Sequence, residues 1–255
     1  MNRYFLKLAF DGTCYHGWQI QKNAVSIQQL LNKSLSLLLS EDIMLTGAGR
    51  TDAGVHAREY FAHFDLEQGL DQPARKKLVY KLNRFLPNDV VVYDVIPVKP
   101  GANARFSATG RTYKYYIHTF KDPFRDKYSQ YLYGRISLEL MNAGAAILVK
   151  THDFTSFSKA DTDTKTNICK VDSAFWTREG NDLVFTIRAD RFLRNMVRAI
   201  VGTLLDLGKG KITLTDLQQI ISSHNRSDAG ESVVAKGLFL EKIEYPPEIF
   251  PEDRE

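Results

Sequence analysis

A single carboxylate in a glycine-rich segment is the feature of this chain best suited to chemistry. Residues 47–56 read GAGRTDAGVH, so Asp52 lies two positions from the permanent cation Arg50. Glycine adopts backbone angles that other residues avoid, and strained turns gather at functional sites. An ordinary Asx turn is the alternative for an isolated Asp-Ala-Gly sequence. The segment therefore indicates either a simple turn or a site where a carboxylate acts beside a guanidinium.

Several other motifs are excluded by spacing. A dinucleotide-binding loop needs a third glycine where Asp52 stands, and a phosphate loop needs Gly-Lys-Ser/Thr, which the chain lacks. An aspartic protease needs a second carboxylate turn to share a proton, and none is present. Two cysteines and six scattered histidines offer no metal-ligand spacing. We therefore expect neither a metal nor a disulfide framework.

Six motifs in chain order resemble those of the TruA-type tRNA pseudouridine synthases. Together they cover nearly the whole sequence. They are residues 11–21, 47–56, 104–108 with 111–115, 152–157, 192–198 and 237–240. Two departures accompany them: Phe239 stands where tyrosine is usual, and residues 57–61 replace a small, glycine-containing run. The second departure could alter how RNA enters the site.

The resemblance implies roles for individual side chains. Asp52 would be the catalytic nucleophile and Arg198 its ion-pair partner. Tyr113 would stack on the uracil, Leu238 would form an apolar wall of the same pocket, and Arg50 would occupy the space vacated by the flipped base. On its own, Tyr113 would be expected in the core, because it shares one strand face with Tyr115 and Ile117. A terminal-strand leucine such as Leu238 is likewise usually core.

Residues 101–135 are rich in both basic and aromatic side chains. They hold seven Lys/Arg against two acids, together with nine aromatic residues. Cations that meet phosphates and rings that stack on bases suit a nucleic-acid surface. Solvated lysines on a strand-rich segment are the alternative. Arg105 and Arg111 are the candidate RNA-binding residues of this stretch.

A helix is predicted over residues 191–207 from its apolar spacing. Its stripe faces a core, while Arg191, Arg194 and Arg198 fall at i, i+3 and i+7 on another face. Like charges at this spacing repel one another, so they need a partner outside the helix. We expect Arg191 and Arg194 to bind RNA; a solvated basic face is the alternative.

The remaining pattern predicts an α+β fold made of two ferredoxin-like halves. The first half, residues 1–100, reads β-α-β-β-α-β, and the second, residues 101–255, repeats that order. The predicted elements of the first half are strands at 3–10, 43–46, 60–65 and 90–95 and helices at 26–39 and 74–85. Those of the second half are strands at 112–119, 171–177, 183–188 and 238–243 and helices at 138–149, 191–207 and 214–222. The resemblance implies the pseudouridine synthase fold, with a catalytic cleft between the two halves.

Composition sets broader limits. Hydrophobic residues at 44% and charged residues at 25% of the 255 residues are typical of a globular protein. No apolar run is long enough to span a membrane, and the N-terminus lacks the apolar region of a signal peptide. The two cysteines fit a reducing compartment, so we expect a cytoplasmic protein. The net charge of +4 is only mildly basic.

The sequence therefore predicts an isomerase that converts uridine to pseudouridine in tRNA without any cofactor. That function is what the resemblance implies, and the resemblance also implies the anticodon stem-loop as the target and a homodimer that binds tRNA across both subunits. Two other functions remain open. A non-catalytic RNA-binding protein could have two ferredoxin-like halves. A metal-free hydrolase could use Asp52, although no second carboxylate is apparent as its partner.

Overall fold

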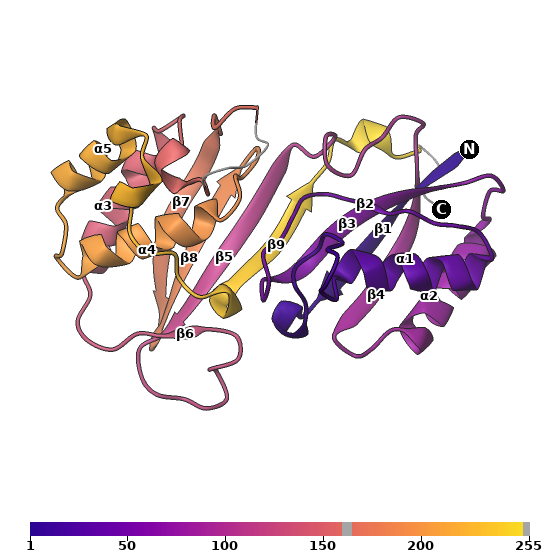
Figure 1. Cartoon of the computed structure of the whole chain (residues 1–255), viewed down its shortest axis with the longest axis horizontal. Coiled ribbons are helices and arrows are strands. Elements are labelled where there is room, and N and C mark those ends of the chain that lie inside the picture. The colour runs from indigo at the N-terminus through magenta and orange to yellow at the C-terminus, as the bar shows by residue number, and fades with distance from the viewer. Residues whose placement is uncertain (160–164, 252–255) are drawn as a thin grey trace. The chain divides into compact units, whose positions relative to one another are not determined.

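The computed structural model describes residues 1–159 and 165–251 and divides the chain into two compact units. Unit 1 comprises residues 1–109 and the C-terminal residues from Leu240 onward, and unit 2 comprises Gly110–Phe239. Both units contain helices and strands (Figure 1). The predicted α+β class is confirmed.

Unit 1 has the predicted order of elements. These are β1 (Asn2–Phe10), α1 (Ile27–Leu39), β2 (Thr46–Gly47), β3 (His56–Leu66), α2 (Gln72–Phe85) and β4 (Val90–Val98). The strands pair in the order β4-β1-β3, with β2 also on β3, and all of these pairings are antiparallel. This is the strand order of a split β-α-β unit, in which the first and third strands lie side by side at the centre.

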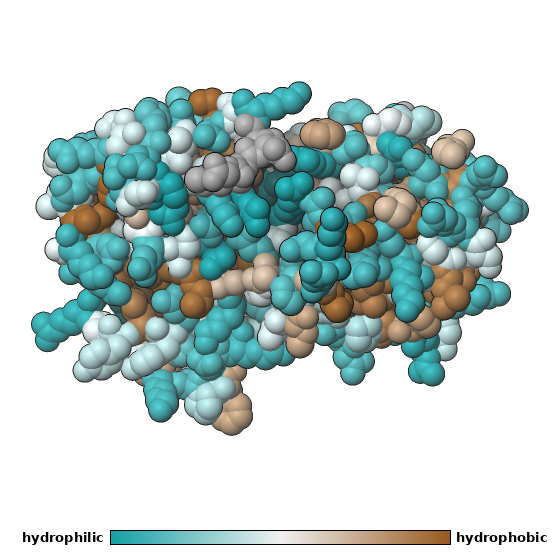
Figure 2. All heavy atoms as spheres, viewed as in Figure 1, coloured by the Kyte–Doolittle hydropathy of each residue, from teal (hydrophilic) through white to brown (hydrophobic). Residues whose placement is uncertain are grey.

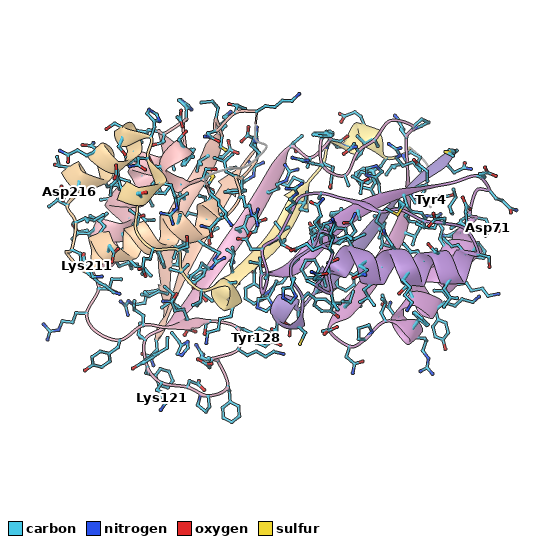
Figure 3. All side chains as sticks on the ribbon, viewed as in Figure 1. Tyr4, Asp71, Lys121, Tyr128, Lys211 and Asp216 are labelled. Atoms are coloured by element: carbon cyan, nitrogen blue, oxygen red, sulfur yellow. The ribbon has the colours of Figure 1, made fainter. Side chains whose placement is uncertain are left out.

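Local chemistry sets the ends of both helices in this unit. Ser26 caps α1 by accepting from the Gln29 N–H group, and Asp71 caps α2 by accepting from Ala74. The Tyr4 hydroxyl accepts from the Leu70 N–H group at 2.7 Å, just before α2; Tyr4 and Asp71 are labelled in Figure 3. These contacts fix the residue at which each helix begins.

The predicted strand at 43–46 is wrong except at Thr46, where β2 begins. Side chains of α1 satisfy the backbone of this segment in place of a neighbouring strand. Asn32 accepts from the Leu45 N–H group at 3.1 Å, and Gln28 donates to the Leu45 carbonyl oxygen at 2.7 Å. Ile43 and Leu45 are buried, so their apolar pattern reflects packing under a loop.

Unit 2 repeats the order with additions. Its elements are β5 (Gly110–His118), β6 (Gln130–Tyr131), α3 (Leu138–Val149), β7 (Val171–Glu179), β8 (Asp182–Ala189), α4 (Met196–Gly208) and α5 (Leu214–Ser223). β9 (Leu238–Glu244) then carries the chain from unit 2 back into unit 1. The order β5-β8-β7 is antiparallel throughout, and the turn between β7 and β8 contains Gly180 at φ 62°.

Helix α4 begins five residues later than predicted. Asn195 has a left-handed backbone with φ 66° and precedes the first helical residue, Met196. Arg191 and Arg194 therefore do not lie on a helix, and the shared arginine face predicted with Arg198 is wrong. The apolar stripe is right from Met196 onward, because nearly all of α4 is buried.

The compact units divide the chain elsewhere than the predicted halves at residue 100. Residues 101–109 and the segment after Leu240 both belong to unit 1. The Tyr245 hydroxyl donates to the Ala104 carbonyl oxygen at 2.5 Å, and its ring lies 5.1 Å from that of Phe5. The C-terminal segment thus completes the core of the unit that carries Asp52.

No helix in the described ranges 1–159 and 165–251 is long and apolar enough to cross a membrane. The face drawn in Figure 2 carries mostly hydrophilic side chains. Below β6 in Figure 1, a long connection projects from unit 2. Figure 3 labels Lys121 and Tyr128 on this connection.

Candidate active site

Residues 47–56, here called the Asp52 loop, run from the last residue of β2 to the first residue of β3 and are fixed to β3. The Ala48 N–H group donates to the Phe61 carbonyl oxygen at 2.8 Å. The Gly49 N–H group donates to the Tyr60 hydroxyl at 3.3 Å, and that hydroxyl donates to the Gly49 carbonyl oxygen. Tyr60 is fully buried and stacks on Trp18 at 4.2 Å. One buried ring therefore determines the path of the loop.

The motif at residues 11–21 packs against the other side of the Asp52 loop. A Cβ atom on Gly12 would lie 2.0 Å from the Val55 carbonyl oxygen. A Cβ atom on Gly17, whose φ is +80°, would lie 2.1 Å from the Thr51 carbonyl oxygen. Only glycine allows so close an approach of two backbones. Two motifs far apart in the sequence thus form one structure.

Polar contacts join the same two segments. The Gly12 N–H group donates to Nδ1 of His56 at 3.1 Å, and an Asp11 carboxylate oxygen lies 3.0 Å from that nitrogen. The Tyr15 hydroxyl donates to Asp89 at 2.7 Å. Burial raises the pKa of Tyr15, and the hydrogen bond to Asp89 raises it further. The tyrosine therefore stays a neutral donor beneath the loop.

Asp52 is half-buried at the turn of this loop, and Arg50 is exposed beside it. The Asp52 carbonyl oxygen accepts from the Val55 N–H group at 3.2 Å, which closes the turn. Gly54 follows with φ 77°, and its N–H group donates to the Tyr15 carbonyl oxygen at 3.2 Å. The backbone thus presents one carboxylate in a fixed position, as a nucleophile requires.

Tyr113 lies on β5 of unit 2 and is less buried than its neighbours on the same strand face. Tyr115 and Ile117 are almost completely buried, whereas Tyr113 is half-buried. Its ring meets the edge of Phe192 with centroids 5.0 Å apart and planes at 83°. The core interpretation therefore holds for Tyr115 and Ile117, whereas Tyr113 is partly exposed.

Arg198 is half-buried in the first turn of α4. Its Nε donates to the Val233 carbonyl oxygen at 2.7 Å, and the Val233 N–H group returns a bond to the Arg198 carbonyl oxygen at 3.2 Å. Burial raises the pKa of the Tyr115 hydroxyl, and the positive charge of Arg198 opposes that rise. The guanidinium therefore lies close to the buried end of Tyr115.

The other predicted residues of unit 2 differ in their burial and contacts. Arg111 donates to the Asp190 carbonyl oxygen at 2.7 Å, Arg194 is exposed and Arg191 is half-buried. Leu238 is buried, as either a core residue or a pocket wall would be. Phe239 is also buried, and its ring contacts the edge of Tyr116 at 5.3 Å.

The predicted site residues are therefore shared between the units. Unit 1 holds Asp52, Arg50 and Arg105, and unit 2 holds the rest: Tyr113, Arg111, Arg191, Arg194, Arg198 and Leu238. The pairing of Asp52 with Arg198 stays a prediction. Sequence reasoning missed the positioning residues Tyr15, Tyr60 and His56. Tyr15 and His56 lie inside the two motifs, which was the available signal, whereas Tyr60 looked like an ordinary strand residue.

The described ranges contain no group of three or more His, Cys, Asp or Glu residues that could hold a metal ion. Both cysteines are free thiols, with Cys14 exposed and Cys169 buried. Burial raises the pKa of the Cys169 thiol to about 12, so it stays protonated. Cys169 is therefore a poor nucleophile, and Asp52 remains the candidate.

Comparison with known proteins identifies the family. Residues 145–246 match the family described as tRNA pseudouridine synthase. The chain is 55% identical to tRNA pseudouridine synthase A of Bacteroides thetaiotaomicron over 256 residues, which cover 99% of this chain and 94% of the relative. It is 55% identical to the Bacteroides fragilis protein of that name over 252 residues, covering 98% and 99% of the two chains. The Exiguobacterium sibiricum protein of that name is 34% identical over 246 residues, covering 96% and 98%.

The fold and these matches together define a pseudouridine synthase. Within that class, the chain belongs to the tRNA pseudouridine synthase A family. The resemblance seen in the sequence motifs is confirmed, since the relatives align over nearly the full length of the chain.

Proposed function

We propose that this protein isomerises uridine to pseudouridine in tRNA, with Asp52 as the nucleophile. The reaction breaks the bond between ribose C1′ and N1 of uracil and forms a bond between C1′ and C5. The C5 proton leaves, and N1 gains a proton. No atom is oxidised, and neither a metal nor a nucleotide cofactor is needed. A carboxylate nucleophile divides this difficult reaction into two easier steps, because it forms a covalent intermediate with the substrate.

The single observation that carries this proposal is the construction of the Asp52 loop. Gly12 and Gly17 allow one segment to approach it closely, and Tyr60 fixes the other side. A protein that only binds RNA does not need to hold one carboxylate this firmly among basic residues. This construction favours the enzyme over the non-catalytic RNA-binding protein that the sequence left open.

Side chains of unit 2 serve the flipped base in this proposal. Enzymes that act on a base take it out of its stack and hold it against aromatic or apolar side chains. Tyr113 would stack on the uracil, Leu238 would form the apolar wall, and Arg50 of unit 1 would fill the space the base leaves. Arg198 would pair with Asp52 and favour its ionised form. The half-buried ring of Tyr113 supports its part.

Phosphate contacts would fall to the remaining arginines: Arg105, Arg111, Arg191 and Arg194. Arginine binds phosphate through several donors in a fixed plane. The resemblance places the substrate uridines in the anticodon stem-loop, among the last three nucleotides on the 3′ side of that arm. The resemblance also supports a cytoplasmic homodimer in which one tRNA binds across both subunits. The family names of the relatives support tRNA as the substrate.

The test replaces Asp52 with asparagine, which keeps its size and removes its charge. Unmodified tRNA transcript labelled with tritium at uracil C5 reports the reaction, because each turnover releases the C5 hydrogen to water. We expect Asp52→Asn to bind tRNA and release no tritium. Asp42→Asn is the matched control, since Asp42 is an exposed aspartate of the same unit. Turnover by Asp52→Asn, or no turnover by the unaltered protein, would overturn the proposal.

A further inference from the structure

Unit 1 presents a second aromatic surface apart from the Asp52 loop. Phe106 lies in residues 102–107, here called the Phe106 loop, and exposes 77% of its surface. The neighbouring Arg105 is also exposed, and its guanidinium carbon lies 5.2 Å from the centre of the Phe106 ring. A large exposed aromatic residue beside a cation offers both a stacking face and a positive charge.

Side chains of the loop fix its shape from within. The Asn103 side-chain oxygen accepts from the N–H groups of Arg105 at 2.9 Å and Phe106 at 3.1 Å. Asn103 and Ser107 exchange two further bonds, at 2.9 and 3.0 Å. An Asx turn of this kind replaces regular secondary structure. The two side chains are therefore presented from a fixed backbone.

Buried groups beneath the loop anchor it to the core. Ala104 is completely buried, and its N–H group donates to Nδ1 of His63 at 3.1 Å. Its carbonyl oxygen accepts from Tyr245, and the Ala102 carbonyl oxygen accepts from Arg3 at 2.9 Å. Arg3 is itself held by two bonds to Asp65, both of 2.7 Å. Every one of these residues belongs to unit 1, so the anchoring is complete within that unit.

This arrangement suits one class of ligand. A ring on a fixed backbone loses little conformational freedom when another flat group stacks on it. Nucleobases stack on aromatic rings irrespective of sequence, and an adjacent arginine contacts phosphate or the base itself. A protein partner would bury such a ring equally well, but the neighbouring guanidinium favours an anionic ligand with flat rings. An unpaired nucleotide of RNA has both properties, whereas paired bases expose only their edges.

We propose that Phe106 and Arg105 form a stacking site for an unpaired base of the RNA substrate. Phe106 supplies the face on which the base lies, and Arg105 contacts the phosphate attached to it. The site serves binding and does not contact the reacting atoms. The inference rests on the proposed function in taking RNA as the ligand and Arg105 as a phosphate contact, and it adds the stacking face of Phe106.

The test measures the affinity of the full chain for an unmodified tRNA transcript and for a blunt RNA duplex of matched length. Phe106→Leu keeps apolar bulk but loses the stacking face. We expect it to weaken tRNA binding about tenfold, within the range measured for one stacked base, and to leave duplex binding unchanged. Phe106→Trp should bind tRNA as tightly as the unaltered protein. Equal losses on both RNAs, or no loss on tRNA, would overturn the proposal.

Two controls separate this result from other causes. Tyr80→Leu removes a ring that is 67% exposed on α2 of the same unit, and it should not alter tRNA binding. Thermal melting of Phe106→Leu should match that of the unaltered protein. An unaltered protein that makes no pseudouridine, combined with weaker tRNA binding by Phe106→Leu, would sink the proposed function and keep the stacking site. Normal turnover by the unaltered protein, combined with unchanged tRNA binding by Phe106→Leu, would keep the proposed function and overturn the stacking site. A change in self-association alone would make Phe106 a protein contact and contradict the inference.

Discussion

The Asp52 loop of unit 1 and residues 190–198 of unit 2, of which the last three begin α4, both carry charged residues on largely irregular backbone, but they are held in different ways. The Asp52 loop lies between β3 and residues 11–21, and glycines allow the close contact. Residues 190–198 depend on polar side chains. Asp190 accepts from the N–H groups of Lys170 and Arg191 at 2.8 and 2.7 Å, and Asn195 takes a left-handed conformation before α4.

This difference shows which irregular structures a sequence reveals. Gly12 and Gly17 stand in a recognisable motif, and glycine is the residue expected where backbones meet or φ is positive. Asn195 does the same work with a side chain, because asparagine tolerates the left-handed region and its amide donates to Ser232 at 2.6 Å. The apolar spacing around Asn195 still fits a helix, so the spacing alone gives no warning.

The largest effect is expected at the contact between the two segments of unit 1. Gly17→Ala places a Cβ atom 2.1 Å from the Thr51 carbonyl oxygen at a φ of +80°, so the backbone next to Asp52 must move. A displacement of about 1 Å at a catalytic group costs on the order of 10²-fold in rate. We expect that loss in single-turnover pseudouridine formation, with tRNA binding largely kept.

Gly69→Ala is the matched control for this substitution. Its new Cβ would lie 3.5 Å from Asn2, which is ordinary contact, and its φ lies outside the left-handed region. It should therefore react at the rate of the unaltered protein. If Gly17→Ala also reacted at that rate, the close approach would have no part in positioning Asp52.

The success of the sequence predictions depends on what determines each element. α3 was predicted at its observed bounds because capping and apolar spacing agree there. The strand at 43–46 was wrong because α1 side chains take its hydrogen bonds, a tertiary effect that the local pattern does not contain. The glycine-rich segment singled out Asp52 and the resemblance supplied its role and that of Tyr113, whereas no local pattern supplied the supporting Tyr60 or His63.

A smaller effect is expected at Asn195, where the observed structure and the predicted helix give opposite signs for the change in stability of Asn195→Ala. If Asn195 lay inside a helix, Asn195→Ala would stabilise the protein, since alanine is the better helix former. In the left-handed conformation, which asparagine tolerates better than alanine, the same change destabilises the protein. It also loses the bond to Ser232, worth about 0.5–1.5 kcal/mol. We expect a lower free energy of unfolding in urea. Asn195→Gly relieves the backbone strain and should cost less, whereas a stabilised Asn195→Ala would restore the predicted helix.

The smallest effect concerns pH and the second anchored loop of unit 1. Burial lowers the pKa of His63 below its ordinary 6.5, the Arg3 charge lowers it further, and Asp65 opposes this. The unfolded chain therefore takes up a proton at a higher pH than the folded one. Stability from the neutral imidazole is complete above about pH 6.5 and is lost as the pH falls toward the lowered value. The loss reaches at most about 1.4 kcal/mol per pH unit.

His63→Gln keeps an acceptor for the Ala104 N–H group and removes the titration, so its stability should fall less between about pH 7 and 5. If the unfolding free energies of the two proteins changed equally with pH across that range, His63 would not titrate as expected. The Phe106 loop would then differ from residues 190–198 only in its packing.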